Sequence, residues 1–237
     1  MYPIQPIIER LEAMRESKYA DFNNGLIPGV SCHMLGVRVP ALRQIAREIA
    51  KESNWRNFLE ASRGHELYEL RLLHGMVLGG AKCEANEKIA MIDAFLPCID
   101  NWAICDGTVS SIKPGKTDAE PLFEYACACA ESDIEFRKRF GLILLMSRFH
   151  DEKHIARTME IYRRFKHDGY YARMGAAWGL ATLWLSDREG CLGILRKNLW
   201  DEWTHNKAIQ KLCESRRISD ADKTLARSLT RGKAETK

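Results

Sequence analysis

The sequence predicts an all-α fold, a solenoid of stacked helix pairs, from three observations. First, apolar residues recur at the i, i+3, i+4 and i+7 spacing of an amphipathic helix, as Ile4, Ile7, Ile8 and Leu11 do. Second, proline and glycine are few, at 7 and 16 of 237 residues. Third, long apolar helices recur at a spacing of roughly 33–35 residues, each after a shorter helix. Their expected starts are Glu66, Asn101, Glu135, Tyr170 and Trp203.

The individual helices follow from the apolar periodicity and from start signals. The expected ranges are 4–18, 41–52, 54–63, 66–81, 86–96, 101–112, 118–131, 134–148, 152–166, 170–185, 188–199, 203–216 and 220–231. Asp100 and Asp187 stand where helix N-caps are expected, and Ser219-x-x-Asp222 has the spacing of a capping box. These local signals agree with the period of the apolar residues.

A helix pair repeated at this period is typical of α-solenoids of the TPR or HEAT and ARM class, whose pairs bury their apolar faces by stacking on their neighbours. Such a stack has a concave inner face, and we expect that face to be basic. Because the chain lacks a Pro/Gly/Ser-rich linker, residues 1–237 are expected to form one domain. Within it, residues 1–36 would hold an N-terminal helix and a loop, and residues 232–237 a frayed tail.

The one loop-like stretch is NNGLIPGVSCHMLG, residues 23–36. Gly25, Pro28 and Gly29 interrupt any helical pattern there. We therefore expect no full second helix between the first helix and Gly36.

Composition limits the class of protein. With 46% hydrophobic and 29% charged residues, the chain can bury a core without disulfides. Its apolar runs are shorter than the roughly 20 residues of a membrane span, and MYPIQPIIERLEAM does not have the pattern of a secretory signal. We expect a cytoplasmic, monomeric protein whose eight cysteines are reduced.

The net charge of +4 lies at the C-terminal end. Residues 186–237 hold 12 Lys and Arg against 8 Asp and Glu, and the remaining residues hold 24 of each. A basic end is typical of proteins that bind phosphate-bearing partners. A solvated helix face followed by a frayed tail explains the same charge equally well.

Several catalytic motifs are excluded by their spacing. Gly115-Lys116-Thr117 would end a phosphate-binding loop only with glycine where Ser110 stands. His150 and His154 are four residues apart, but the glutamate between them is one place too late for a zinc protease motif. The sequence also lacks G-x-S-x-G and G-x-G-x-x-G. We expect no metal and no cofactor.

Four residues of the long helices share one helical stripe. Counted from the expected helix starts, they stand at offsets 1, 5, 4 and 8, which lie on one face of a helix. They are Trp102, Asp106, Arg139 and Trp178. Four further residues at offsets 4, 5 or 8 extend the stripe: Arg71, His74, Lys207 and Lys211. In stacked helix pairs these side chains would form a track of indoles, one carboxylate and basic groups.

Such a track suits a nucleic-acid backbone next to a positively charged group. Arginine and lysine neutralise phosphates, while indole faces and a carboxylate stabilise positive charge. Each residue also has a plain structural interpretation. A tryptophan in an apolar helix often belongs to the core, Asp106 can hydrogen-bond between helices, and Arg139 can pair with Glu135 at i, i+4.

At these residues the chain resembles the AlkD-type DNA alkylation repair family, the HEAT-like-repeat DNA glycosylases. The resemblance covers nearly the whole chain, and its most specific element is the W-x-x-x-D step. Its segments are GVRVPALR (36–43), YELRLLHGMVLG (68–79), IDNWAICD (99–106), FRKRFG (136–141), MGAAWGL (174–180) and NKAIQKLCESRRIS (206–219).

The resemblance implies a function and roles for single residues. It implies a DNA glycosylase that hydrolyses the N-glycosidic bond of N3- or N7-alkylated purines. Trp102 and Trp178 would flank the damaged nucleotide, Asp106 would be the catalytic carboxylate, and Arg139 would hold the DNA backbone.

One feature departs from the family pattern. The family's glycosylases place two helices before the segment that corresponds to residues 36–43, and the second helps to engage the lesion strand. The sequence here predicts only the first. A non-catalytic module that binds DNA structures or a protein partner through the same face is therefore the alternative function.

Overall fold

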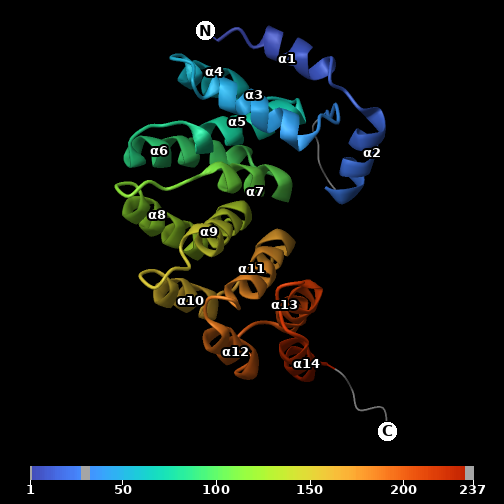
Figure 1. Cartoon of the computed structure of the whole chain (residues 1–237), viewed down its shortest axis with the longest axis vertical. Helices are drawn as coiled ribbons and strands as arrows, with labels where there is room; N and C mark the ends of the chain where they lie inside the picture. The colour runs from blue at the N-terminus through green and yellow to red at the C-terminus, as the bar shows by residue number, and fades with distance from the viewer. Residues whose placement is uncertain (1, 28–32, 233–237) are drawn as a thin grey trace. The chain divides into compact units, whose positions relative to one another are not determined.

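The computed structural model describes residues 2–27 and 33–232. Over these residues the chain forms fourteen α-helices and one short 3-10 helix (Figure 1). They hold no β-strand, only an isolated bridge between His33 and Leu67. No helix in these ranges combines the length and the apolar composition of a membrane span.

The helices agree closely with the expected ranges after residue 39. They are α1 (Gln5–Glu12), α2 (Ser17–Leu26), α3 (Val39–Ile49), α4 (Trp55–Ser62), α5 (Tyr68–Gly80), α6 (Ala85–Phe95), α7 (Trp102–Ser111), α8 (Ala119–Glu131), α9 (Glu135–Arg148), α10 (Ile155–Arg163), α11 (Tyr170–Leu183), α12 (Arg188–Arg196), α13 (Glu202–Glu214) and α14 (Asp220–Ser228). The 3-10 helix, Leu96–Cys98, follows α6 and was not predicted.

The chain divides into two compact units, Met1–Leu122 and Phe123–Lys237. In the first unit α5 packs against α3 and α7, and α4 and α6 also contact it. In the second unit α11 packs against α9 and α13, α12 contacts α10 and α11, and α14 contacts α13. Each unit is therefore built around one central long helix.

The predicted repeat is confirmed. The long helices α5, α7, α9, α11 and α13 begin 32 to 35 residues apart, and another α-helix precedes each one. The preceding helix is shorter in every pair except α6 and α7, where α6 is one residue longer. The fold class is accordingly an all-α solenoid of helix pairs. The concave basic face and the single-domain organisation stay predictions.

The predictions for the N-terminal region are wrong in two respects. The first helix ends at Glu12 rather than at residue 18, and a second helix of ten residues, α2, follows it. The break occurs because Glu16 adopts an extended backbone, φ −130° and ψ 95°, and its N–H donates to the carbonyl of Leu35 at 3.2 Å. Of the three expected helix breakers, Pro28 and Gly29 lie outside the described residues.

Contacts with the following segment explain why α2 forms. Gly36 has φ +84°, and a Cβ there would lie 2.3 Å from the carbonyl oxygen of Glu16, so only glycine permits this approach. Arg38 binds Glu16 at 2.8 Å, and its guanidinium lies 4.0 Å from the centroid of the Tyr19 ring. Gly25 falls in the last turn of α2, where a poor helix former interrupts few hydrogen bonds.

Of the N-caps expected at Asp187, Ser219 and Asp100, the first two are confirmed and the third is wrong. Ser53 and Ser132, which also stand where N-caps are expected, cap neither α4 nor α9. Asp187 accepts a hydrogen bond from the N–H of Gly190 at 2.8 Å, and Ser219 accepts one from Asp222 at 3.1 Å. At α7 the cap is not Asp100 but Asn101, whose Oδ1 accepts from Ile104 at 3.0 Å. The shift by one residue leaves the Asp100 carboxylate available to another partner.

Cysteines and possible metal ligands are dispersed. None of the seven cysteines within residues 2–27 and 33–232 forms a disulfide, and Cys32 lies outside those ranges. The same residues contain no group of three or more His, Cys, Asp or Glu side chains that is placed to hold a metal ion.

Candidate functional site

The first part of the candidate site is the N-terminal half of α7. Trp102 begins this helix and Asp106 follows one turn later, so both side chains project from the same face. Both are half-buried, which leaves each in contact with the protein and with solvent. This confirms that the W-x-x-x-D step lies on one helix.

Small residues fix the position of α7 against α5. A Cβ on Gly75 would lie 1.9 Å from Oγ1 of Thr108, and a Cβ on Gly79 would lie 2.8 Å from Cβ of Ser111. The two helices therefore approach too closely for any side chain at those positions. Because α5 is buried along nearly its whole length, it is a firm support for the carboxylate of Asp106.

Trp102 connects α7 with the helix that the sequence did not predict. Its indole Nε1–H donates a 3.1 Å hydrogen bond to the carbonyl of Leu26, the last residue of α2. That bond satisfies the only polar group of the indole, so the rest of the ring is an apolar contact surface.

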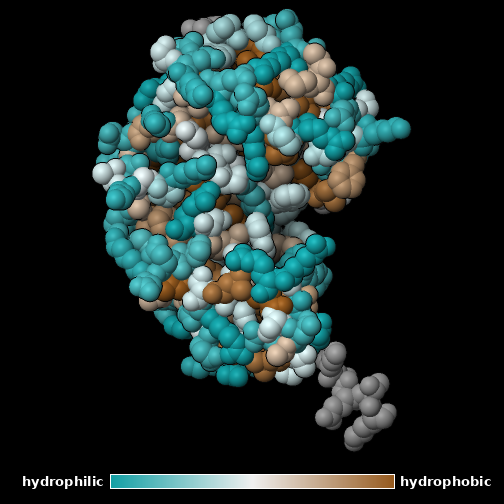
Figure 2. Space-filling model, in the orientation of Figure 1, coloured by the Kyte–Doolittle hydropathy of each residue, from teal (hydrophilic) through white to brown (hydrophobic). Residues whose placement is uncertain are grey.

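The end of α2 beside Trp102 presents apolar side chains to solvent. Phe22 is 62% exposed and Leu26 is 49% exposed. Figure 2 shows hydrophobic residues gathered on the surface over this end of α2. The first unit thus holds a carboxylate and an oriented indole on one turn of α7, and the exposed apolar end of α2 is hydrogen-bonded to that indole.

Arg71 occupies a buried position rather than an open face. Only 7% of the residue is exposed, and its guanidinium binds Asp100 at 2.9 Å and the carbonyl of Cys98. The carboxylate that the N-cap prediction assigned to α7 is therefore the partner of Arg71. This arginine joins α5 to the segment that precedes α7.

His74 is also buried. Its Nδ1 lies 3.0 Å from Oγ of Ser62, and its ring stacks on Phe95 at 4.0 Å between centroids. Burial, followed by the positive charge of Arg63, lowers the pKa of His74 to about 3. A neutral, enclosed imidazole has no charge to offer a phosphate, so His74 is not part of the proposed DNA interface.

Sequence reasoning missed Glu69, a fully buried carboxylate at the start of α5. Its oxygens accept hydrogen bonds from the backbone N–H groups of Leu35, Gly36 and Val37 at 2.8 to 3.3 Å. Glu69 thereby holds the segment that carries Gly36 against α5. Gly36 in turn lies against the N-terminal end of α2. A single carboxylate in the mainly apolar stretch 67–79 was the available signal.

In the second unit Trp178 and Arg139 differ in their exposure to solvent. Trp178 lies on α11 and is 41% exposed, an unusual fraction for so large an apolar ring. Arg139 lies on α9, is buried, and donates from Nη1 to the carbonyl of Tyr171 at 2.8 Å. Arg139 therefore ties α9 to the first turn of α11.

Lys207 and Lys211 lie one turn apart on α13 and are half-exposed. Their ammonium groups bind neighbours on the same helix, Gln210 at 2.7 Å and Glu214 at 2.8 Å. Surface pairs of this kind contribute little to stability, so both lysines can exchange these partners for a phosphate at small cost.

The sequence-predicted residues thus fall into two groups in each unit. Trp102 and Asp106 in the first unit, and Trp178, Lys207 and Lys211 in the second, reach solvent. The others are enclosed by protein: Arg71, His74 and Arg139.

Comparison with known proteins identifies the family. No curated protein and no solved structure matches the chain. The family model described as "DNA alkylation repair enzyme" matches residues 7–212, which include α2, the Trp102 and Asp106 turn of α7, and the two lysines of α13. The chain belongs to the family of DNA alkylation repair enzymes.

Proposed function

We propose that this protein is a DNA glycosylase that hydrolyses the N-glycosidic bond of purines alkylated at N3 or N7. The observation that carries the proposal is the turn of α7 that presents Trp102 and Asp106 together, with the indole anchored to Leu26 of α2. The family match supports DNA as the partner.

The proposed chemistry uses the charge that alkylation creates. A purine alkylated at N3 or N7 is cationic, so it leaves as a neutral base without strong acid catalysis. Positive charge then develops on the sugar as the glycosidic bond breaks. A fixed carboxylate stabilises that charge and can orient the water that adds to the sugar. Asp106 has this role in the proposal.

The indoles have a complementary role. The indole face of Trp102 in the first unit and that of Trp178 in the second each attract positive charge through the ring quadrupole and can each pack on the apolar part of a nucleotide. Lys207 and Lys211, which belong to the second unit, bind phosphates of the DNA backbone. Arg71 and Arg139 act in the proposal by positioning α7 and α11 through their buried hydrogen bonds.

The presence of α2 bears on the proposal, because its expected absence was the feature of the sequence that argued against a glycosylase. The expected absence of α2 set this chain apart from glycosylases that engage the lesion strand with a second helix. The chain has α2, its apolar end is exposed, and its last carbonyl binds Trp102. These contacts support a role for Phe22 and Leu26 beside the lesion.

The deciding experiment measures the release of free 3-methyladenine and 7-methylguanine from methylated duplex DNA by mass spectrometry. The parent should release at least one of them. Asp106→Asn should lower the rate by a factor of about 100 or more, because the transition state loses its fixed charge. Glu60→Gln, which neutralises an exposed carboxylate on α4, should match the parent.

The alternative function is that of a non-catalytic module that binds structured DNA. The exposed lysines and aromatic rings of the second unit favour it, because they depend neither on Asp106 nor on α7. Folded parent protein that binds DNA and releases no base would establish this alternative and refute the glycosylase.

A further inference from the structure

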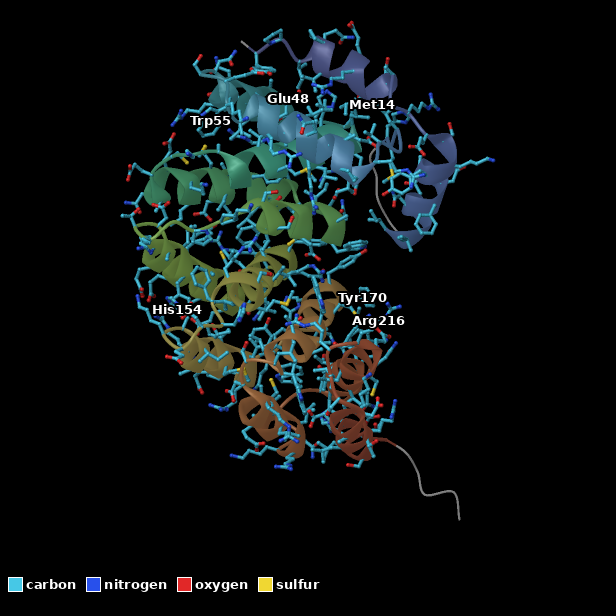
Figure 3. All side chains as sticks on the ribbon, viewed as in Figure 1. Met14, Glu48, Trp55, His154, Tyr170 and Arg216 are labelled. Atoms are coloured by element: carbon cyan, nitrogen blue, oxygen red, sulfur yellow. The ribbon has the colours of Figure 1, made fainter. Side chains whose placement is uncertain are left out.

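Tyr170 is an exposed aromatic residue to which neither the sequence nor the family comparison assigns a role. It begins α11 (Figure 3) and is 56% exposed. Trp178 stands eight residues later on the same helix, so the two rings lie on one face, about 12 Å apart along the axis. In the second unit, over residues 123–232, these are the only aromatic residues among the exposed large hydrophobic side chains.

The ring of Tyr170 rests on other aromatic rings rather than standing alone. Its centroid lies 5.6 Å from that of Trp203 on α13 and 5.3 Å from that of Tyr171. Tyr171 in turn packs against Phe136 of α9 at 5.1 Å. A row of four rings therefore crosses α9, α11 and α13, and Tyr170 is its exposed member.

Two cations lie over the Trp203 ring of this row. The guanidinium of Arg173 lies 4.4 Å from the Trp203 ring centroid, and the ammonium of Lys207 lies 5.4 Å from it. Arg173 is itself fixed, because it donates to Oγ1 of Thr204 at 3.0 Å and binds Asp201. The ring of Trp203 is thus held in place, and both cations lie over this ring, which is the neighbour of the exposed tyrosine.

An exposed aromatic ring, a rigid aromatic support and adjacent cations are the parts of a site that stacks nucleic-acid bases. A base has two flat faces for the ring, and its phosphates are complementary to Lys207 and to Lys211 one turn beyond. Bases inside a duplex are already stacked on their neighbours, so such a site selects an unpaired base.

We propose that Tyr170 stacks an unpaired base of the bound DNA, at a subsite built by α11 and α13 alone. The ligand class is DNA that contains a gap, a bulge or a displaced nucleotide. The proposal relies on DNA as the partner and does not require base excision. It adds to the lesion site on α7 a second contact that recognises disrupted pairing.

The test compares two labelled DNAs by fluorescence anisotropy: an intact duplex and the same duplex with a short single-stranded gap. All proteins carry Asp106→Asn, so that catalysis does not alter the DNA. The background protein should prefer the gapped DNA. Tyr170→Ala should weaken binding to gapped DNA by about 5- to 150-fold, the range for loss of a base-stacking aromatic, and should leave binding to intact duplex unchanged.

Two control variants separate stacking from general damage. Tyr170→Phe keeps the ring and should retain the preference for gapped DNA. Leu185→Ala removes another exposed apolar side chain of the second unit, which is 43% exposed, and should match the background protein. Equal affinity of the background protein for both DNAs, or an equal loss for both with Tyr170→Ala, would overturn the proposal.

A fluorescent base analogue reports the stacking directly. With 2-aminopurine at an unpaired position of the gap, the background protein and Tyr170→Phe should quench its emission and Tyr170→Ala should not. Absence of base release in the mass-spectrometric assay refutes excision but leaves these binding results as they are, so the two proposals fail independently.

Discussion

One long helix in each unit, α5 in the first and α13 in the second, carries two predicted basic residues, and the two helices place them in opposite environments. In the first unit Arg71 and His74 are enclosed, one in an ion pair with Asp100 and the other against Ser62 and Phe95. In the second unit Lys207 and Lys211 lie at the surface with partners on their own helix. All four share similar helical offsets, so the offset alone does not decide whether a cation meets solvent.

The number of neighbouring helices explains the difference. In the first unit α5 contacts four other helices, α3, α4, α6 and α7, and twelve of its thirteen residues are buried. In the second, α13 packs chiefly on α11 and α14, and keeps residues such as Lys207 and Lys211 at its surface. A charge on a fully surrounded helix must find a partner inside the protein, whereas a charge on a partly covered helix can bind a ligand.

The largest expected effect is on stability in the first unit. Arg71→Ala removes the buried partner of Asp100 and of the Cys98 carbonyl, and we expect it to lower the free energy of unfolding by about 3 kcal/mol. Urea denaturation measures this loss. Arg216→Ala, at an exposed arginine after α13 (Figure 3), should change it by less than about 0.5 kcal/mol.

The result also tests the comparison between the units. If Arg71→Ala left stability unchanged and weakened DNA binding, Arg71 would belong to the interface, as the sequence predicted. The contrast between enclosed and exposed cations would then be lost.

The second effect is a pH dependence that arises from His74. Its pKa is about 3 in the folded protein and about 6.5 when the chain is unfolded. Between these values only the unfolded state binds the proton, so stability falls as the pH falls. This group should account for a loss of about 2 kcal/mol between pH 7 and pH 5.

Comparison with a non-titrating variant isolates that contribution. His74→Leu should be less stable than the parent at pH 7, because the contact with Ser62 is lost. The difference should narrow as the pH falls to 5, since the variant no longer binds this proton on unfolding. Parallel stability curves for the two proteins would show that His74 is not held neutral.

The smallest effect on free energy is expected in the second unit, and it concerns DNA binding. Joint replacement Lys207→Ala and Lys211→Ala should reduce the slope of log K against log salt by about 1.8, which is about 0.9 for each lost phosphate contact. Affinity should fall by about tenfold at moderate salt. Stability should change by less than about 0.5 kcal/mol.

A matched pair of substitutions controls for net charge. Arg196→Ala with Lys197→Ala removes two exposed positive charges at the end of α12, in the same basic stretch of the sequence. That variant should retain most of the salt dependence. Equal losses for both pairs would mean that the whole basic end attracts DNA and that α13 has no particular role.

Local sequence information was sufficient for most of the helices. The apolar period sets helix faces, and caps such as Asp187 and Ser219 set helix starts. Both depend on residues within a few positions of one another. The step from Trp102 to Asp106 is of the same local kind, since a separation of four residues places both on one face of any helix.

Tertiary contacts determined what the local pattern did not contain. Helix α2 forms although it contains Gly25, which the sequence marks as a breaker, because Gly36 and Arg38 pack on it from the following segment. The hydrogen bond from Trp102 to Leu26 joins residues 76 positions apart. No periodicity relates such distant positions.

The all-α class, the repeat of helix pairs and the membership of the family follow from the amino-acid sequence, because they depend on periodicity and on motifs of a few residues. Which residues of the predicted stripe reach solvent follows only from the packing of the helices. Exposure depends on how many helices surround a residue, and it separates the buried Arg71, His74 and Arg139 from the exposed Trp178. Packing between distant segments therefore selects the surface that is available to DNA.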